Sequence, residues 1–455
     1  MRSDAVDRAL AELDRPRDCG WRLEFAKRFA QVPEPPPPST FARVARLPVL
    51  AVAFLLAGLR VILDVARYRS GPVRAAAQIA VVHGEWTNRT RHLLTLLPAD
   101  GHVPVIIVGR PRGPLADVAA LFAQHRPSLA VPLVRALAWR ALLRALPAMA
   151  CALARGTVVA WRASITLDLA ETTAIAYRVL AGHVHAAWWR AGTARPHVAI
   201  FGHSGVADTS LLERAMQQRG TTTVHLLHGV STGHDFDGLS SLLITQCGHD
   251  ARLHAAMGGY RATIWPSDPP PPFAPAVTPD WLLLTNLAHP TNAIYQQRGI
   301  AAELEVIGIA AQAARAAGVS LVYRPHPALA ALPAQDREAV RACAAREGVL
   351  DWPADRPYSA IAGFATVLIT ASTALLDLLR SGRVPVLVDT IEADPLTLYQ
   401  SYDWRADTPE AVAAAVAEIA DDPSAALEAA WKALSPARAI ADWDDLSGIV
   451  GHHRA

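Results

Sequence analysis

The sequence predicts an α/β protein of two domains, each built on a parallel β-sheet, with a helical extension in front of them. Its 455 residues exceed the size of one ordinary hydrophobic core. From residue 78 onward, short apolar runs alternate with longer helical stretches, a pattern typical of parallel α/β architecture. A proline-rich stretch at 266–275 interrupts this alternation, so we place the domain boundary there.

The changes in sequence pattern along the chain divide it into four segments. Residues 1–70 form a helical N-terminal segment, and 71–265 form the first α/β domain. Residues 266–276 are a stiff, extended linker because of their prolines, and 277–455 form the second α/β domain.

Each domain has its own series of expected elements. In the first, strands are expected at 78–83, 103–108, 197–201, 223–227 and 242–245, with helices at 88–97, within 115–195, at 208–220 and from 249. In the second, strands are expected at 281–285, 319–323, 365–369 and 384–388, with helices at 294–317, 334–347, 372–381 and from 408. Because parallel sheets bind ligands at the carboxyl ends of their strands, polar residues just after a strand are the candidates for a site.

Two apolar segments carry arginines. Residues 47–59 are uncharged and flanked by arginines, and 133–153 has three arginines among Leu, Ala and Trp. A spanning helix needs about 20 apolar residues, so the first run is short. Each segment fits either an amphipathic helix on an anionic membrane surface or a packed core helix. Together they favour a peripheral position on the inner face of the cytoplasmic membrane.

Bulk features exclude several classes of protein. A net charge of +2 argues against nucleic-acid binding. The four cysteines are far apart and form no C-x-x-C pair, as expected of free thiols in a reducing compartment. The polar N-terminus is not a cleavable signal peptide. No zinc-binding spacing, P-loop or G-x-S-x-G motif occurs.

A first candidate site follows the strand that ends at residue 227. His228 and Gly229 leave this strand, and an imidazole there can take a proton from a hydroxyl near neutral pH. Asp235 and Asp237 follow in a glycine-rich loop, and each is an alternative base or a turn former. They form a D-x-D pattern, but not at the end of a hydrophobic strand, so we expect no metal site.

The second candidate site is the motif Arg324-Pro325-His326-Pro327, which closes an apolar strand. The prolines stiffen the loop. His326 can neutralise or protonate a departing phosphate, and Arg324 can pair with it. A proline-stiffened turn with a surface histidine is the structural alternative.

The third candidate site is Thr370-Ala371-Ser372-Thr373, with Asp377 one turn later. A helix start needs one hydroxyl as a cap, and this one has Thr370, Ser372 and Thr373. Hydroxyls and N–H groups at a helix start bind phosphate.

A fourth and weaker candidate follows the first strand of the second domain. If Thr285 and Asn286 face the other domain, we expect them to contact either the phosphate of a bound donor molecule or the acceptor that receives the transferred group. The alternative is that they only pack at the hinge between the two domains.

The order of these motifs resembles that of a bacterial family. A His-Gly pair, an Arg-Pro-His-Pro motif and a Ser/Thr cluster followed by an acid are similar to those of transferases that build surface polymers. These include CDP-glycerol glycerophosphotransferases, polysialyltransferases and Kdo transferases. The resemblance covers roughly residues 197–390. It implies two Rossmann-like domains facing a cleft (GT-B architecture), with the acceptor on the N-terminal and the nucleotide donor on the C-terminal domain.

The resemblance also implies roles for individual residues. His228 is the candidate base, His326 serves the donor phosphate, Ser372 and Thr373 clamp that phosphate, and Asp377 stands where the family often has glutamate. Such enzymes are usually inverting, need no tightly bound metal and lie peripherally on the cytoplasmic membrane.

Two departures from the family pattern concern the donor. His228-Gly229 is followed by Val-Ser-Thr-Gly rather than the Thr-Pro-Leu-Lys of glycerophosphotransferases, and only Asp237-Gly238 matches the acidic motif of polysialyltransferases. The donor could therefore be a CMP-sugar, a CDP-alditol, a UDP-sugar or a GDP-sugar. We favour a CMP- or CDP-linked donor.

We expect an inverting, metal-independent glycosyltransferase, or a glycerophosphoryl-type transferase, that needs no cofactor. It would move a group from a nucleotide-activated sugar or alditol to a surface polysaccharide or lipid-linked acceptor. One alternative is a non-hydrolysing UDP-sugar 2-epimerase-like enzyme, which would turn over without an acceptor. Another is a non-catalytic, membrane-associated component of polysaccharide assembly.

Overall fold

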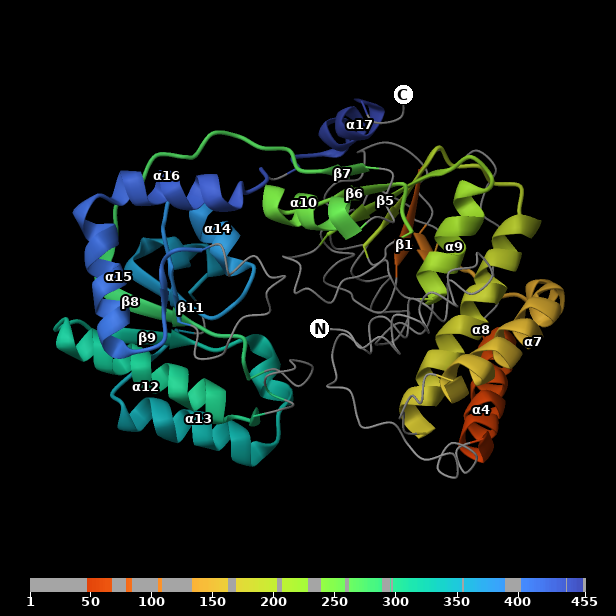
Figure 1. Ribbon diagram of the computed structural model, residues 1–455, viewed down its shortest axis with the longest axis horizontal. Helices are drawn as coiled ribbons and strands as arrows, with labels where there is room; N and C mark the ends of the chain where they lie inside the picture. Colours follow the sequence, from red (N-terminus) through yellow and green to blue (C-terminus); the bar gives the residue numbers. More distant parts are fainter. Residues whose placement is uncertain are drawn as a thin grey trace.

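The computed structural model describes residues 47–67, 79–83, 105–108, 133–162, 169–202, 207–227, 239–257, 262–288, 295, 298–353, 356–388, 402–438 and 440–452. Within them the chain forms two α/β domains, each around its own parallel sheet (Figure 1). The two sheets confirm the predicted fold class of two Rossmann-like domains in a GT-B-like arrangement.

The N-terminal sheet is parallel throughout. Its described strands are β1 (Ile79–His83), β2 (Val105–Ile107), β3 (Leu133–Arg135), β4 (Val198–Phe201), β5 (Thr222–Leu226), β6 (Leu242–Ile244) and β7 (Ala262–Ile264), in the order β3-β2-β1-β4-β5-β6-β7. The direction of strand addition reverses between β1 and β4, and open α/β sheets bind ligands at such a switch point.

Helices cover both faces of this sheet. The described helices of this domain are α4 (Leu47–Arg67), α7 (Trp139–Arg162), α8 (Leu169–Ala191), α9 (Ala207–Gln217), α10 (Gly248–Met257) and α17 (Trp443–His452). Successive residues of a strand face opposite sides. Ala80 and Val82 of β1 join the core with α8 and α9, and Val81 joins the core with α17. Helices α4 and α7 pack together on the outer side of α8 (Figure 1).

The C-terminal sheet repeats the same plan. Its described strands are β8 (Thr278–Leu284), β9 (Leu321–Arg324), β10 (Leu350–Asp351), β11 (Phe364–Ile369), β12 (Val386–Val388) and β13 (Arg405–Ala406), in the order β10-β9-β8-β11-β12-β13. Every described strand pair is parallel. Its switch point lies between β8 and β11.

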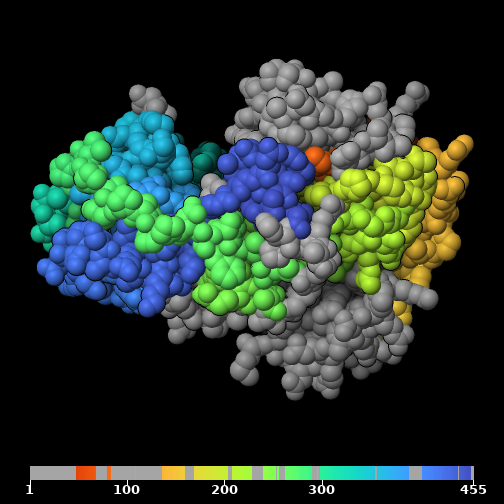
Figure 2. All heavy atoms as spheres, turned by 90° about the horizontal axis from the view of Figure 1, so that it is seen from above, coloured from red at the N-terminus to blue at the C-terminus, as the bar shows by residue number. Residues whose placement is uncertain are grey.

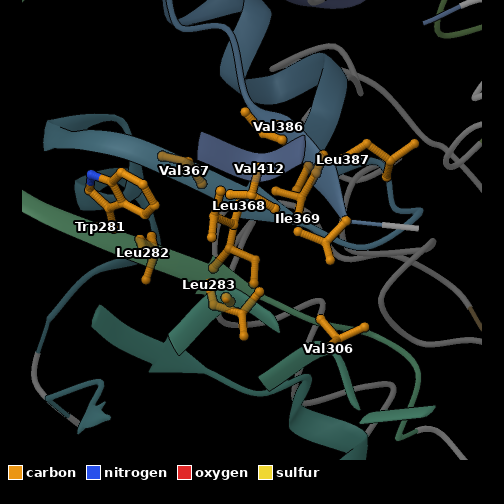
Figure 3. Close-up of a cluster of buried hydrophobic side chains, with 14 of the residues drawn as sticks. Trp281, Leu282, Leu283, Val306, Val367, Leu368, Ile369, Val386, Leu387 and Val412 are labelled. Carbon is orange, nitrogen blue, oxygen red and sulfur yellow. The ribbon is translucent and has the colours of Figure 1, made fainter. Parts of the chain in front are cut away.

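One hydrophobic core fills the C-terminal domain (Figure 3). The α-helices around it are α12 (Ala301–Ala316), α13 (Ala334–Arg346), α14 (Ala374–Arg380), α15 (Pro409–Asp421) and α16 (Pro423–Leu434), with the short 3-10 helices η1 (Pro327–Ala331) and η2 (Tyr358–Gly363). Central strands are apolar at successive positions, as Leu282 and Leu283 of β8 show, because helices bury both faces of the sheet.

The proline-rich linker 266–276 docks on the C-terminal domain. The Ala274 N–H donates to the Gly382 carbonyl at 3.0 Å, and Arg383 Nη1 donates to the Ala274 carbonyl at 2.6 Å. Gly382 has a φ of +73°, and a Cβ there would lie 2.3 Å from the Pro272 carbonyl oxygen. This position therefore requires glycine.

The end of the chain crosses back to the N-terminal domain. The Ala437 N–H donates to the Gln246 carbonyl at 2.7 Å, and the Arg438 N–H donates to the Pro266 carbonyl at 2.8 Å. Beyond this crossing, Leu446 and Val450 of α17 join the hydrophobic core that includes residues of β1 and β4. In Figure 2 the blue end of the chain accordingly lies beside the green residues of the N-terminal domain.

The structure differs from the predicted segments at both ends of the chain. The predicted C-terminal domain, 277–455, includes α17, which packs on the N-terminal sheet. The predicted extension, 1–70, includes α4, which is part of the N-terminal helical layer. Both differences are matters of long-range packing, which local periodicity does not report.

Short strands account for the other differences. The stretch 115–195, predicted as helical, contains β3, and β7, β10 and β13 were not predicted at all. Strands of two or three residues carry too little alternation to show a period. The predicted helix at 88–97 lies outside the described residues.

Candidate functional site

Three of the predicted motifs meet at one edge of the C-terminal sheet. Strands β9, β8 and β11 are neighbours in that order, and their carboxyl ends carry Arg324 and His326, Thr285 and Asn286, and the segment 370–373. Because all three strands are parallel, these groups lie on one side of the sheet, around the switch point between β8 and β11.

Asn286 and Thr370 fasten the two strands on either side of the switch point. The Thr370 hydroxyl donates to Asn286 Oδ1 at 2.9 Å and accepts from the Asn286 backbone N–H at 3.0 Å. Asn286 Nδ2 also donates to the Ala371 carbonyl at 2.5 Å. Thr370 is buried, so in this structure its hydroxyl shapes the edge rather than facing a ligand.

Thr285 is turned into the core instead of facing the other domain. It is only 6% exposed, and its hydroxyl donates to the carboxylate of Glu303, itself 1% exposed. The Tyr323 hydroxyl donates to the same Oε1 at 2.5 Å, and the Ala288 N–H donates to Oε2 at 3.0 Å. Burial raises the pKa of Glu303, against the lowering effect of these donors. The network fixes the loop after β8.

His326 is the N-cap residue of the short helix η1. Its backbone is extended (φ −61°, ψ 139°), and its Nδ1 accepts from the Ala328 N–H at 3.1 Å. A neutral imidazole that accepts at Nδ1 carries its proton on Nε2. The cap therefore selects the tautomer in which Nε2–H is a donor, which suits a phosphate oxygen.

Arg324 lies among aromatic rings. Its guanidinium carbon is 4.8 Å from the centre of the Tyr358 ring and 5.6 Å from that of Trp352, which is cation–π geometry. The Tyr358 hydroxyl is hydrogen-bonded to Asp377 of α14. Burial and Asp377 raise the pKa of Tyr358 to about 12, so it stays a donor at neutral pH. Tyr358 thus connects the end of β9 with α14.

Two hydroxyl side chains stand at the start of α14, and only that of Ser372 accepts a hydrogen bond from a backbone N–H of the helix. Ser372 Oγ accepts from the Ala374 N–H at 3.3 Å. Thr373 occupies the N-cap position, yet its side chain makes no capping bond. Both residues are partly exposed at the switch point. Because α14 has only seven residues, we give its dipole little weight and rest the site on side chains.

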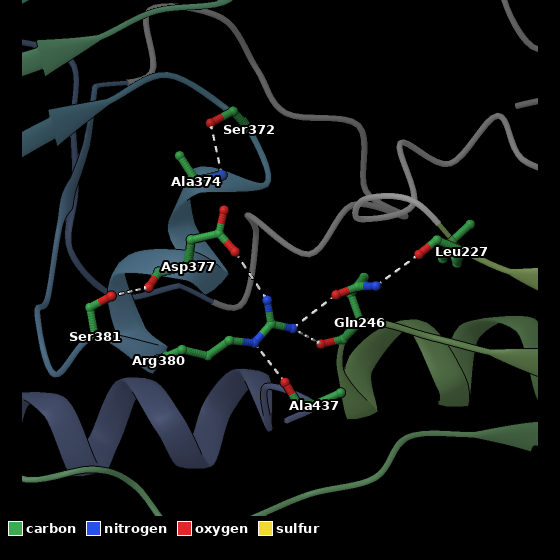
Figure 4. A network of polar contacts seen from close by, with 8 residues as sticks. All are labelled: Leu227, Gln246, Ser372, Ala374, Asp377, Arg380, Ser381 and Ala437. Atoms are coloured by element: carbon green, nitrogen blue, oxygen red, sulfur yellow. Dashed lines mark hydrogen bonds and ion pairs between the residues drawn. The ribbon is translucent and has the colours of Figure 1, made fainter. Parts of the chain in front are cut away.

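Asp377 and Arg380 of α14 connect the two domains (Figure 4). Arg380 Nη1 donates to Asp377 Oδ1 at 3.1 Å, and Arg380 Nη2 donates to the carbonyl and to Oε1 of Gln246 at 3.1 and 2.9 Å. Arg380 Nε donates to the Ala437 carbonyl at 2.6 Å. Burial raises the pKa of Asp377, against the effect of Arg380. Gln246 belongs to the N-terminal domain, so one guanidinium joins both domains and the returning chain.

The same network extends to Leu227, the last described residue before the first predicted motif. Gln246 Nε2 donates to the carbonyl of Leu227 at 2.9 Å, at the end of β5 and immediately before His228. His228, Asp235 and Asp237 lie outside the described residues. Within the described part of the chain, no three His, Cys, Asp or Glu side chains gather as metal ligands.

Replacing Arg380 with alanine is expected to lower the free energy of unfolding by about 2–3 kcal/mol. The change removes charge-assisted bonds and leaves the Gln246 and Ala437 carbonyls without this donor. The control is Arg341→Ala, which removes an exposed ion pair to Glu338 at 3.7 Å and should cost under about 0.5 kcal/mol. Urea unfolding measures both; equal midpoints for the two variants would show that Arg380 does not couple the domains.

Comparison with known proteins finds solved structures that are similar to this chain in fold only. No protein-family model matches the chain, and none of the curated proteins does. A solved structure of S. aureus MnaA with UDP has 12% identity over 83% of this chain and 95% of its own, with a TM-score of 0.42. The UDP-GlcNAc 2-epimerase from Methanocaldococcus jannaschii has 10% identity over 74% and 91%, with a TM-score of 0.39. A UDP-N-acetylglucosamine 2-epimerase has 12% identity over 84% and 98%, with a TM-score of 0.41. Similarity at this level does not assign an activity.

Sequence reasoning missed several residues that shape the site: Gln246, Glu303, Tyr358 and Arg380. One signal was present for Glu303, an acidic residue among the apolar positions of a helix. Gln246 and Arg380 are 134 positions apart, and no local pattern marks a residue whose partner is that distant.

Proposed function

We propose that this chain is an enzyme that binds a nucleotide-activated sugar at the carboxyl edge of the C-terminal sheet. The observation that carries the proposal is that Arg324 and His326 lie at the carboxyl end of β9, and Ser372 and Thr373 at that of β11, on either side of β8. A guanidinium, an imidazole N–H and two hydroxyls are the groups that recognise phosphate oxygens.

Transfer to an acceptor is the chemistry that we favour. When the bond between the sugar and its phosphate breaks, negative charge develops on the leaving phosphate. Arg324 and His326 would stabilise that charge where it forms. The base would come from the loop after β5, as His228, Asp235 or Asp237, and remove the proton of the acceptor hydroxyl. The bonds from Gln246 to Leu227 and from Arg380 to Gln246 support this, because together they connect the end of β5 with the domain that would hold the donor.

Epimerisation of the sugar is the second candidate. UDP-sugar 2-epimerase is the activity named for two of the structures with a similar arrangement. The same phosphate site would serve it, because that reaction also begins from a bound nucleotide-sugar. The two candidates differ in one observable: epimerisation proceeds without an acceptor, whereas transfer requires one.

A nucleotide screen tests the proposal. UMP, UDP, CMP, CDP and GDP are each added to the wild type and to Thr373→Ala, with thermal unfolding and titration calorimetry as readouts. At a hundredfold excess over Kd, the preferred nucleotide should raise the Tm of the wild type by about 5 °C. In Thr373→Ala the affinity should fall about tenfold with an unchanged Tm in the absence of ligand, because the Thr373 side chain makes no capping bond.

Thr408→Ala is the matched control. Thr408 also occupies an N-cap position, but its hydroxyl accepts from the Ala411 N–H at 3.2 Å. Its loss should lower stability by about 1 kcal/mol and leave nucleotide affinity unchanged. The proposal fails if no nucleotide shifts the Tm of the wild type. If Thr373→Ala binds as tightly as the wild type, the phosphate lies elsewhere.

A further inference from the structure

Helix α4 has its polar and apolar residues in the reverse of the usual arrangement for a surface helix. Its buried side presents Asp64, which accepts from the Tyr177 hydroxyl at 2.7 Å, and Arg60 lies over the Tyr177 ring at 5.0 Å. Its outward side is apolar from Val52 to Leu63, and Leu55 is 73% exposed. A helix facing water has the opposite arrangement.

Helix α7 extends this outward surface. Trp139 and Leu143 are exposed by 51% and 63%, and Leu146 is also exposed. We call the exposed side chains of α4 and α7 the outer face. Both helices lie on the far side of α8 from the C-terminal domain, and α7, in orange, forms the outer edge of the molecule in Figure 2. Because α4 and α7 pack against each other, their exposed apolar side chains form a surface of the kind that marks an interaction site.

The charges on the outer face have one sign. Arg140 and Arg144 lie one turn apart on α7, and both are exposed. Asp64 is the one acidic residue within α4 and α7, and it is buried. Exposed aliphatic side chains together with an exposed tryptophan and two exposed arginines suit the boundary between acyl chains and anionic headgroups.

The packing of α4 and α7 against their neighbours determines the orientation in which they can contact a membrane. By length and composition alone, each helix is long and apolar enough to cross a membrane. However, α4 buries Ala57, Val61 and Val65 against the neighbouring helices along its length. Only one side is available to lipid, so the helix axes would lie along the membrane surface.

We propose that the outer face of α4 and α7 docks this protein on an anionic phospholipid membrane. The aliphatic side chains enter the acyl boundary, and Arg140 and Arg144 contact the phosphates of the headgroups. This proposal goes beyond nucleotide binding and does not depend on it, because the outer face and the C-terminal sheet belong to different domains.

Vesicle co-sedimentation of the full chain tests the proposal. The wild type should bind vesicles of phosphatidylcholine mixed with phosphatidylglycerol, and bind pure phosphatidylcholine more weakly. Leu55→Glu should lower the partition coefficient at least about tenfold. Arg140→Gln and Arg144→Gln should each lower it about fivefold on the anionic vesicles alone. Added salt should lower the vesicle binding of the wild type towards that of a variant that carries both Arg140→Gln and Arg144→Gln.

Val277→Glu is the matched control. Val277 is 89% exposed in the C-terminal domain, so it receives the same charge at an exposed apolar position away from the outer face. This variant should bind vesicles as the wild type does. Circular dichroism should show both glutamate variants folded, because neither position is buried.

Three outcomes would overturn the proposal. One is a wild type that stays in the supernatant with anionic vesicles. Another is Leu55→Glu binding as well as Val277→Glu. The third, seen by light scattering, is a dimer that Leu55→Glu turns into a monomer without vesicle binding, because a second copy would then cover the outer face. Nucleotide titration of the same variants keeps this test separate, since loss of nucleotide binding would leave the vesicle result unchanged.

Discussion

Replacing His326 with alanine is expected to lower the turnover of a nucleotide-activated sugar by about 10²- to 10⁴-fold. The imidazole accepts from the Ala328 N–H at Nδ1, so its proton is on Nε2, the atom that the proposed function assigns to the leaving phosphate. Alanine removes both the cap and the donor. A steady-state assay with the nucleotide chosen by the binding screen measures the effect.

His326→Asn separates the two roles of the imidazole. An asparagine oxygen can accept from the Ala328 N–H and keep the cap, but asparagine has no donor where Nε2 lies. We expect this variant to be as inactive as His326→Ala, with the stability of the wild type. His326→Ala should also lose about 1 kcal/mol of stability. An active His326→Asn would show that the histidine only caps η1.

Replacing Glu303 with leucine is expected to lower the free energy of unfolding by about 3–5 kcal/mol. The carboxylate accepts from the hydroxyls of Thr285 and Tyr323 and from the Ala288 N–H, in a site that is closed to water. Leucine leaves three buried donors without an acceptor, and each costs about 1–3 kcal/mol. Urea unfolding measures the loss.

Glu303→Gln is the control, and it also tests the ionisation of this group. Its amide can accept from the Ala288 N–H and donate to the two hydroxyls, so the change should cost under about 1 kcal/mol. Because burial raises the pKa of Glu303, the folded state holds this proton more tightly than the unfolded state. The wild type should therefore lose stability relative to Glu303→Gln as pH rises above about 4.3, the ordinary value for glutamate. A difference that does not change with pH would contradict the raised pKa.

The central strands of both domains were predictable because each is a buried apolar run with a polar residue at its end. The runs ending near residues 227, 324 and 369 are β5, β9 and β11. Their motifs are local in sequence, and parallel pairing brings the carboxyl ends of β9, β8 and β11 to one edge. The location of the candidate site followed from these two facts.

The roles of individual residues at this edge were less predictable. Thr285 and Thr370 are of a residue type that often binds ligands. In the structure, however, their hydroxyls donate hydrogen bonds to Glu303 and Asn286. The sequence shows that a hydroxyl follows a strand. Whether it turns inward depends on which partner the rest of the fold places behind it.

The amino-acid sequence by itself determined that this protein has two parallel α/β domains and a proline linker. It also determined that hydroxyl, imidazole and guanidinium side chains follow the ends of neighbouring strands. These features depend on patterns within about ten residues. Only the tertiary structure decided that α17 returns to the first domain, that Arg380 joins the two domains and that α4 turns its apolar side outward. Each of these depends on contacts between residues far apart in the chain, where the free energy of packing and of buried hydrogen bonds, rather than local preference, selects the arrangement.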